Sequence, residues 1–86
     1  MTDDELKAIR SRCDAATRGP WKAYVEGRDH ESGSSFIRTG GEARGEDIEL
    51  SGATPADYDF IAHARQDVPA LVVEVARLRR LLGEAR

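Results

Sequence analysis

The segment AATRGPWKAYVE, residues 15–26, contains the change from helix to strand on which the fold depends. Pro20 has no amide hydrogen with which to continue a helix, and it biases Gly19 toward an extended backbone, so a helix ends here. Beyond the turn, side chains alternate between two faces, with Trp21, Ala23 and Val25 on one and Lys22, Tyr24 and Glu26 on the other. A period of two indicates a half-buried strand. We therefore expect the turn to fold Trp21 back over the preceding helix, where its ring fills part of a small core.

The residues before this turn predict a helix over residues 1–18. Thr2 and Glu5 have the spacing of a capping box, in which each side chain bonds the backbone amide of the other residue. Apolar side chains then recur at spacings of three and four residues, at Leu6, Ile9, Cys13 and Ala16. This spacing gives the helix one face that packs on the rest of the protein.

The central region, residues 27–54, is rich in glycine and serine and predicts a small antiparallel meander. Two short strands are expected within it, at 35–39 and 47–50, separated by Gly40-Gly41 and a charged loop. Together with the strand that starts at Trp21, they predict a β meander over residues 21–51. Its loops are long for so small a protein, and such loops are either functional or mobile.

A second helical region is expected over residues 55–84. Thr54 is a suitable N-cap and Pro55 a suitable first helical residue. Pro69 predicts a kink or a break, and the sequence leaves open whether the helix continues through it. Apolar residues recur in this region with the 3-4 spacing of a heptad repeat, at Ile61, Ala64, Val68, Leu71, Val75, Leu78 and Leu82.

This heptad spacing predicts that the second helix serves in self-association. Three heptads are short for an independent coiled coil, so we expect the helix to dock partly on its own domain and partly on another copy. Glu74 and Arg79 have the spacing for an ion pair between parallel chains. The residues expected at the oligomer interface are Val68, Leu71, Val75, Leu78 and Leu82.

Length and composition indicate one small α+β domain, residues 1–86, with an N-terminal helix, a small antiparallel sheet and a C-terminal helix. A chain of 86 residues buries a thin core, which oligomerisation commonly supplements. The single cysteine excludes an intrachain disulfide and suits a reducing compartment. No apolar run spans a bilayer and no signal peptide is recognisable, so we expect a cytoplasmic protein without a membrane partner. The net charge of −3 argues against DNA as a partner.

No constellation of catalytic or metal-binding side chains is apparent in the sequence. Cys13 falls on the apolar face of the first helix, where we expect a small buried hydrophobic residue. His30 and His63 share no metal-ligand spacing with each other or with this cysteine. The glycines at 40, 41 and 45 are not followed by the Lys-Ser/Thr pair of a phosphate loop. We therefore predict a protein that is not an enzyme and that holds no metal or cofactor.

Two stretches do suggest a ligand-binding site. In the first, Arg18 stands three residues before Trp21, and in the second, alanines leave room beside His63 and Arg65. Arginine binds carboxylates and phosphates through two parallel hydrogen bonds, and aromatic side chains stack on nucleobases. The alternative is structural, with Arg65 packed on Trp21 as a cation–π pair and His63 as a surface or packing residue. The expected ligand-binding residues are Arg18, Trp21, Tyr24, Arg38, Tyr58, His63 and Arg65.

Two motifs resemble the Ead-like early proteins of lambdoid phages and similar short proteins of actinobacterial phages and prophages. The first is Ala-Ala-Thr-x-Gly-Pro-Trp at residues 15–21. The second is Asp-x-x-Phe-Ile-Ala-x-Ala-Arg at residues 57–65, followed by Pro-Ala-Leu at 69–71. The resemblance covers both ends of the chain and leaves residues 27–53 unmatched. The family usually has proline where this chain has Arg18, which either loosens the turn or adds a positive group beside Trp21.

The resemblance implies a bacteriophage accessory protein that is made early in infection and directed at host regulators or immune signals. Together with the arginine and aromatic residues, it favours a non-enzymatic homo-oligomer that sequesters a small nucleotide-like signal of host defence in the host cytoplasm. The main alternative is a protein-interaction module that binds and modulates a host protein through its C-terminal helix. A purely structural coiled-coil adaptor leaves the β region unexplained. DNA binding is the weakest hypothesis, because the basic residues are dispersed.

Overall fold

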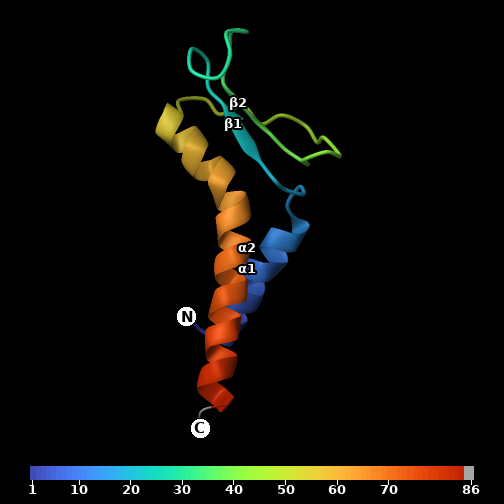
Figure 1. Cartoon of the computed structure of the whole chain (residues 1–86), viewed down its shortest axis with the longest axis vertical. Coiled ribbons are helices and arrows are strands. Elements are labelled where there is room, and N and C mark those ends of the chain that lie inside the picture. The colour runs from blue at the N-terminus through green and yellow to red at the C-terminus, as the bar shows by residue number, and fades with distance from the viewer. Residues whose placement is uncertain (85–86) are drawn as a thin grey trace.

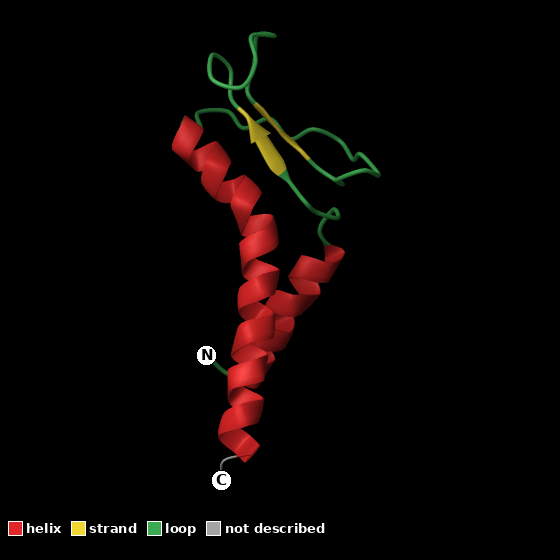
Figure 2. Ribbon diagram, in the orientation of Figure 1, coloured by secondary structure: helices red, strands yellow, loops and turns green. Residues whose placement is uncertain are grey.

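The computed structural model describes residues 1–84 and confirms the predicted α+β class. Its elements follow in the order α1 (Asp3–Ala15), β1 (Lys22–Tyr24), β2 (Phe36–Arg38) and α2 (Pro55–Glu84). The molecule is elongated, with principal extents of 56 × 25 × 19 Å. The two helices lie against each other, while the sheet lies beside the first turns of α2 (Figure 1). Loops make up most of the chain around the sheet (Figure 2).

Helix α1 is held at its start by the predicted capping box. The Thr2 hydroxyl accepts from the Glu5 amide at 3.1 Å, and the Glu5 carboxylate accepts from the Thr2 amide at 2.9 Å. These bonds lower the pKa of the Glu5 carboxyl, because they favour its charged form. The helix ends at Ala15, earlier than the predicted end at residue 18.

The two strands form an antiparallel sheet with the alternation that the sequence predicts. Lys22 pairs with Arg38, Ala23 with Ile37 and Tyr24 with Phe36. Ala23 is buried together with Val25, whereas Lys22 is exposed. One face of the sheet therefore packs on α2 and the other points away from it.

The third predicted strand, residues 47–50, is reduced to a single bridge. The Ile48 amide donates to the Ile37 carbonyl at 2.9 Å, and the Ile37 amide donates to the Ile48 carbonyl at 2.8 Å. On either side of this bridge the backbone bonds side chains instead. The Glu46 carbonyl accepts from the Thr39 hydroxyl, and the Leu50 amide donates to the hydroxyl of a tyrosine on α2. A ladder cannot continue when its flanking groups have these partners.

A small core fills the space between the sheet and α2. Its buried members are Ala23, Val25, Ile37, Tyr58 and Ala62. Tyr58 is 5% exposed, and its hydroxyl lies 3.2 Å from the carbonyls of both Ser35 and Leu50 while accepting from the Leu50 amide. The Tyr58 side chain of α2 therefore joins the segment before β2 to the segment after the Ile37–Ile48 bridge.

Helix α2 runs without a break from Pro55 to Glu84, with Pro69 inside it, which answers the question that the sequence left open. Pro69 cannot donate to the carbonyl of Arg65 one turn earlier, and the helix axis bends between its first turns and the remainder (Figure 1). Packing holds the helix on both sides of the proline, since Ala62 and Val72 are buried. Among the described residues, neither helix is long and apolar enough to cross a membrane.

Two side chains of α2 fasten residues 17–21 in place. The Nε atom of Arg65 donates to the Thr17 carbonyl at 2.8 Å, and the Trp21 indole donates to the same carbonyl at 3.0 Å. The Gln66 amide group accepts from the Trp21 backbone amide and donates to the Trp21 carbonyl, both at 3.0 Å. We refer to these four bonds as the turn clamp. Gln66 therefore occupies both backbone hydrogen-bonding groups of Trp21, immediately before β1, as a neighbouring strand would.

Candidate functional site

The face of the sheet that points away from α2 carries aromatic and basic side chains. Alternation places Lys22 and Tyr24 beside Arg38 and Phe36 on this face. The Tyr24 and Phe36 rings stack, with centroids 5.2 Å apart and planes at 15°. The Lys22 ammonium lies over the Tyr24 ring, 5.1 Å from its centroid, as a cation–π contact. The sheet therefore presents a preformed aromatic surface with a cation on it.

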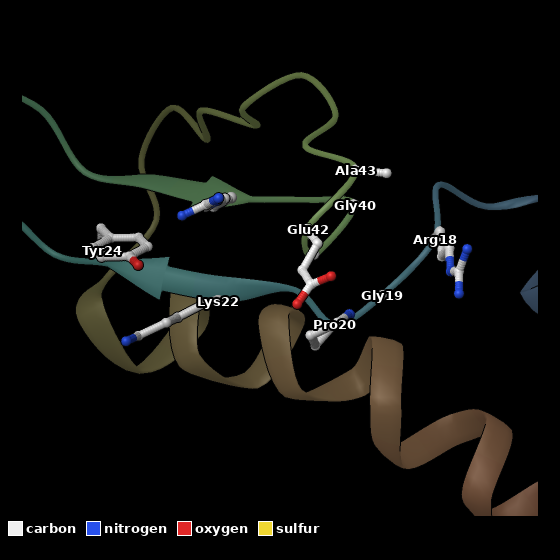
Figure 3. A pocket seen from close by; sticks show the side chains of 10 residues that line it. Arg18, Gly19, Pro20, Lys22, Tyr24, Gly40, Glu42 and Ala43 are labelled. Carbon is white, nitrogen blue, oxygen red and sulfur yellow. The ribbon is translucent and has the colours of Figure 1, made fainter.

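A pocket of about 660 Å³ lies beside this face, within the size range of small-molecule sites. It forms where the start of β1, the end of β2 and two loops meet (Figure 3). Its charged lining residues are three cations and one anion, Arg18, Lys22, Arg38 and Glu42, which gives a net formal charge of +2. Because the whole chain carries −3, positive charge is concentrated here. We name this the sheet pocket; its other lining residues are Gly19, Pro20, Tyr24, Gly40, Gly41 and Ala43.

Two backbone segments at this pocket fit closely against each other. The Gly40 amide donates to the Arg18 carbonyl at 2.7 Å. Gly41 has a φ of +58°, and a Cβ atom there would lie 2.8 Å from Cδ of Pro20. A Cβ atom on Gly45 would lie 2.5 Å from the hydroxyl of Thr39. Gly41 therefore allows the loop to approach Pro20 closely at the pocket, and Gly45 leaves room for the Thr39 side chain.

Arg38 brings an unused hydrogen-bond donor to the sheet pocket. Its Nε atom is buried and has no hydrogen-bond partner among the described residues. Buried polar groups normally have a partner, so the described chain leaves the hydrogen-bonding capacity of this N–H unused. Because the cations and Tyr24 line one pocket, an anionic group and an aromatic ring can be held side by side.

The sheet pocket brings together three of the residues predicted to bind a ligand, Arg18, Tyr24 and Arg38. The others lie elsewhere. Arg65 and Trp21 belong to the turn clamp, in which both side chains donate hydrogen bonds to the Thr17 carbonyl. Tyr58 is buried in the core, where little of its ring is left for stacking. His63 is exposed, and its Nδ1 lies 2.8 Å from the Asp59 carbonyl one turn earlier on α2.

Lys22 and Glu42 line the sheet pocket but are not among the residues predicted to bind a ligand. Lys22 could be predicted, because the period of two places it on the same strand face as Tyr24. Glu42 could not, because it lies on a loop whose path depends on the close approach of Gly41 to Pro20. That contact joins segments about 20 residues apart, and no local pattern signals it.

A second concave region lies between the two helices. This groove has a volume of about 300 Å³, and Trp21 reaches the side of α1 there, as predicted. We name it the helix groove. Its lining residues are mostly apolar: Ile9, Arg12, Cys13, Ala16, Trp21, Ile61, Ala64, Arg65, Val68 and Pro69.

The residues predicted at an oligomer interface remain largely exposed in the single chain. Leu71, Leu78 and Leu82 are 62, 52 and 59% exposed, and α2 instead buries a neighbouring face that contains Val72. With Val75, which is half-buried, these three leucines continue the 3-4 spacing past the helix groove. We name Leu71, Val75, Leu78 and Leu82 the apolar stripe. A row of exposed apolar side chains on one helix face is a candidate interaction surface.

Intrachain ion pairs compete with the predicted pair between parallel chains. Glu74 binds Arg77 on the same helix, and this bond lowers the pKa of Glu74 and raises that of Arg77. Arg79 binds the Asp3 carboxylate and the Met1 carbonyl at the start of α1. Both members of the predicted Glu74–Arg79 pair therefore have partners within their own chain.

Ionic contacts attach the loop that follows β1 to α2. Arg28 donates to both carboxylate oxygens of Asp59, at 2.8 and 2.9 Å, and also binds Asp29. Hydrogen bonds from Arg28 lower the pKa values of Asp59 and Asp29. Reciprocally, the bonds to Asp59 and Asp29 raise the pKa of Arg28. This network fixes the loop beside the first turns of the helix.

Ser32, His30 and Glu26 come together in the same loop, but without the arrangement of a catalytic triad. The Ser32 hydroxyl lies 2.6 Å and the Glu26 carboxylate 3.5 Å from the same ring nitrogen, Nδ1 of His30. A triad needs the nucleophile on one ring nitrogen and the acid on the other, so this cluster does not activate Ser32. Within residues 1–84, no group of three histidine, cysteine, aspartate or glutamate side chains is placed to hold a metal ion.

No protein-family model, curated protein or solved structure matches this chain. The resemblance to the Ead-like early proteins stays a prediction from two short motifs. In the structure these motifs meet, because Arg65 of the second binds Thr17 of the first through the turn clamp. This contact gives Arg65 a structural role that requires no ligand.

Proposed function

We propose that this protein is a non-enzymatic binder that holds a small nucleotide-like molecule in the sheet pocket and sequesters it as a homo-oligomer. The observation that carries the proposal is that Arg18, Lys22 and Arg38 line one pocket of about 660 Å³ together with Tyr24. A nucleotide combines negative charge with a planar ring, and the sheet pocket offers partners for both.

The phosphate of such a ligand is expected to lie beside Lys22 and Arg38, which pair across the sheet, with Arg18 at the other end of the pocket (Figure 3). The Arg38 guanidinium suits paired phosphate oxygens, whereas the Lys22 ammonium acts as a mobile point charge. The net charge of +2 at the pocket suits a ligand that carries one or two negative charges.

The ring of the ligand is expected to stack on Tyr24. Phe36 supports this ring by stacking on it, and the Lys22 ammonium lies over it. A base that stacks there takes the place of the ammonium, which is then free to pair with the phosphate. Stacking of a base on an aromatic side chain contributes about 1–3 kcal/mol in single-stranded nucleic-acid sites.

The composition of the sheet pocket supports ligand binding without catalysis. Its lining, all within the described chain, includes no serine, cysteine or histidine, and Glu42 is its one carboxylate. A nucleophile paired with a base, as hydrolases use, is therefore not present in the lining. Sequestration requires affinity and a sufficient amount of protein, because the free ligand concentration falls by mass action.

The resemblance to phage early proteins supplies the proposed biological setting. A phage protein directed at the host would act in the host cytoplasm and remove a nucleotide-like signal of host defence. This part of the proposal rests on the two short motifs, and the binding chemistry rests on the sheet pocket.

NMR titration with AMP, ADP, a cyclic dinucleotide, adenosine and inorganic phosphate tests the binding chemistry. The nucleotides should shift the amide signals of Lys22, Tyr24 and Gly41, while adenosine and phosphate alone bind more weakly. The amide of Ser11 in α1 serves as an internal reference, since it lies outside the pocket lining. If millimolar concentrations of every nucleotide leave the pocket signals unmoved, the proposal is wrong.

Charge variants show whether the pocket itself is responsible. Arg38→Gln and Lys22→Ala should each weaken nucleotide binding about tenfold or more, because each removes one charged partner. Arg10→Gln makes the same change in charge on the exposed surface of α1 and serves as the matched control. An equal loss in the Arg10 variant would assign binding to overall charge and contradict the proposal.

A protein-interaction module is the second candidate, and the exposure of the apolar stripe favours it. Amphipathic helices dock such residues in hydrophobic grooves of other proteins. Analytical ultracentrifugation separates the two candidates. A chain that stays monomeric at high micromolar concentration keeps the stripe accessible to a host protein, whereas a self-associated chain covers it.

A further inference from the structure

We propose that the apolar stripe and the helix groove form one continuous interface with a second copy of this chain, and that the two copies pack antiparallel. The inference specifies the self-association contained in the proposed function. It requires no ligand, so it stands or falls separately from the sheet pocket.

The two parts of this surface lie at different heights on α2. The helix groove is lined by Ile61, Ala64 and Val68 in the first half of the helix, beside Cys13 of α1. The most exposed leucines, Leu71, Leu78 and Leu82, follow toward its C-terminal end. The unbroken 3-4 spacing puts both parts on one side of the helix. One part of the surface is therefore hollow, and the other protrudes.

An antiparallel pair brings the hollow part of each copy against the protruding part of the other. Full overlap places the two-fold axis near Leu71, because this residue lies midway between Ile61 and Leu82. Leu78 of the second copy then lies opposite Ala64, in the helix groove that Cys13 also lines. Such an interface is self-complementary, so it needs no second kind of chain. A parallel pair would set groove against groove and leave both unfilled, contrary to the close packing of protein interiors.

The charges of α2 favour the same orientation. The first half of α2 carries three acids, Asp57, Asp59 and Asp67, and one base, Arg65. The second half, up to residue 83, carries one acid, Glu74, and three bases, Arg77, Arg79 and Arg80. Antiparallel copies place the acidic half of one helix beside the basic half of the other, whereas parallel copies place charges of the same sign beside each other. Part of this charge is paired within the chain, so it contributes to orientation more than to affinity.

The native thiol of Cys13 allows a direct test, because it lines the helix groove. In the full chain, Leu78→Cys should form an interchain disulfide between Cys13 and the introduced thiol under mild oxidation. Peptide mass spectrometry identifies the linked residues. Val73→Cys is the matched control, because Val73 is 64% exposed but lies off the stripe, and it should form this cross-link in much lower yield.

The double variant Cys13→Ser/Leu78→Cys distinguishes the two orientations. Antiparallel packing holds its introduced thiols far apart, so we expect no cross-link. A disulfide between the two introduced thiols would indicate parallel packing and overturn the proposal. Sedimentation of the unmodified protein as a monomer at high micromolar concentration would overturn it as well.

Two aspartate variants test the surface without relying on thiol chemistry. Leu78→Asp should weaken self-association by about tenfold or more, because a charge would be buried without a partner, whereas Val73→Asp should leave it unchanged. Equal effects of the two substitutions contradict the assigned interface. Nucleotide titration of both variants shows separately whether the sheet pocket binds, so a failed interface and a failed ligand proposal give different results.

Discussion

Around the sheet, side chains hold separate backbone segments together, whereas the second half of α2 leaves apolar side chains exposed. The side chains around the sheet hydrogen-bond the backbone of other segments, as Tyr58, Thr39 and Gln66 do. Along the second half of α2, by contrast, three leucines are more than half exposed and the ion pairs lie on the surface. We therefore expect a pocket built by the first kind of contact to be complete within one chain, and a surface of the second kind to be completed by another molecule.

Substitutions in the two regions should therefore affect stability differently. Ile37→Ala, at a residue that is 0% exposed, should lower the free energy of unfolding by about 2–5 kcal/mol, because it leaves a cavity in the core. Leu78→Ala should change it little in the dilute monomer, where this side chain already contacts water. Urea unfolding at low protein concentration measures both. Equal losses would show that the apolar stripe is part of the chain's own core.

Two glycine variants separate the free-energy cost of disturbing the close packing at the sheet pocket from the cost of a positive φ. Gly52→Ala, at a φ of +77° with open space around the Cβ position, should cost about 1–2 kcal/mol. Gly41→Ala meets Pro20 as well, so it should cost about 1–3 kcal/mol more. Thermal unfolding compares the two variants. Similar melting temperatures would mean that the loop is not packed on the turn as described.

The turn clamp should contribute measurably to the connection between the two regions. Gln66→Ala removes two hydrogen bonds to Trp21 and should lower the free energy of unfolding by about 1–3 kcal/mol. Gln66→Glu keeps an acceptor for the Trp21 amide but loses the donor, so an intermediate loss is expected. Hydrogen exchange at the Trp21 amide is the specific measurement. Exchange that is unchanged in Gln66→Ala would contradict the role assigned to this side chain.

The Arg28 network should produce a small dependence of stability on pH. The pKa values of Asp29 and Asp59 are lowered in the folded protein, so their contribution is present above the ordinary aspartate pKa of about 4 and is lost as the pH falls through the lowered values. Because these groups are exposed, the effect is modest. Arg28→Gln should reduce the fall in melting temperature on acidification, whereas Arg10→Gln should not. An identical acid response in both variants would assign the dependence to other carboxylates.

Much of the helical architecture could be predicted from local signals. The capping box at Thr2, Pro20 in the turn and the alternation from Trp21 each act over a few residues and appear in the structure as expected. The strand expected at 47–50 could not be judged locally, because Tyr58 and Thr39 bond the neighbouring backbone from elsewhere. The continuity of α2 through Pro69 likewise depends on packing that no sequence pattern shows.

The candidate site could be predicted only in part for the same reason. Arg18, Tyr24 and Arg38 meet in the sheet pocket, whereas Arg65 has a structural position that its sequence neighbourhood does not distinguish from a ligand-binding one. The deciding fact is that Arg65 lies beside the Thr17 carbonyl, 48 positions away in the chain. Arginine can have a structural or a ligand-binding role, and its tertiary contacts determine which one.

Nucleotide titration of the unmodified protein and of Leu78→Asp, followed by NMR at the Lys22, Tyr24 and Gly41 amides, tests most directly whether the sheet pocket is complete within one chain. We predict that these amides shift in both proteins with the same affinity, although the variant is monomeric. Loss of the shifts in the monomeric variant would show that the pocket requires a second copy. Shifts confined to the helix groove in either protein would place the ligand at the wrong end of the molecule and contradict the account.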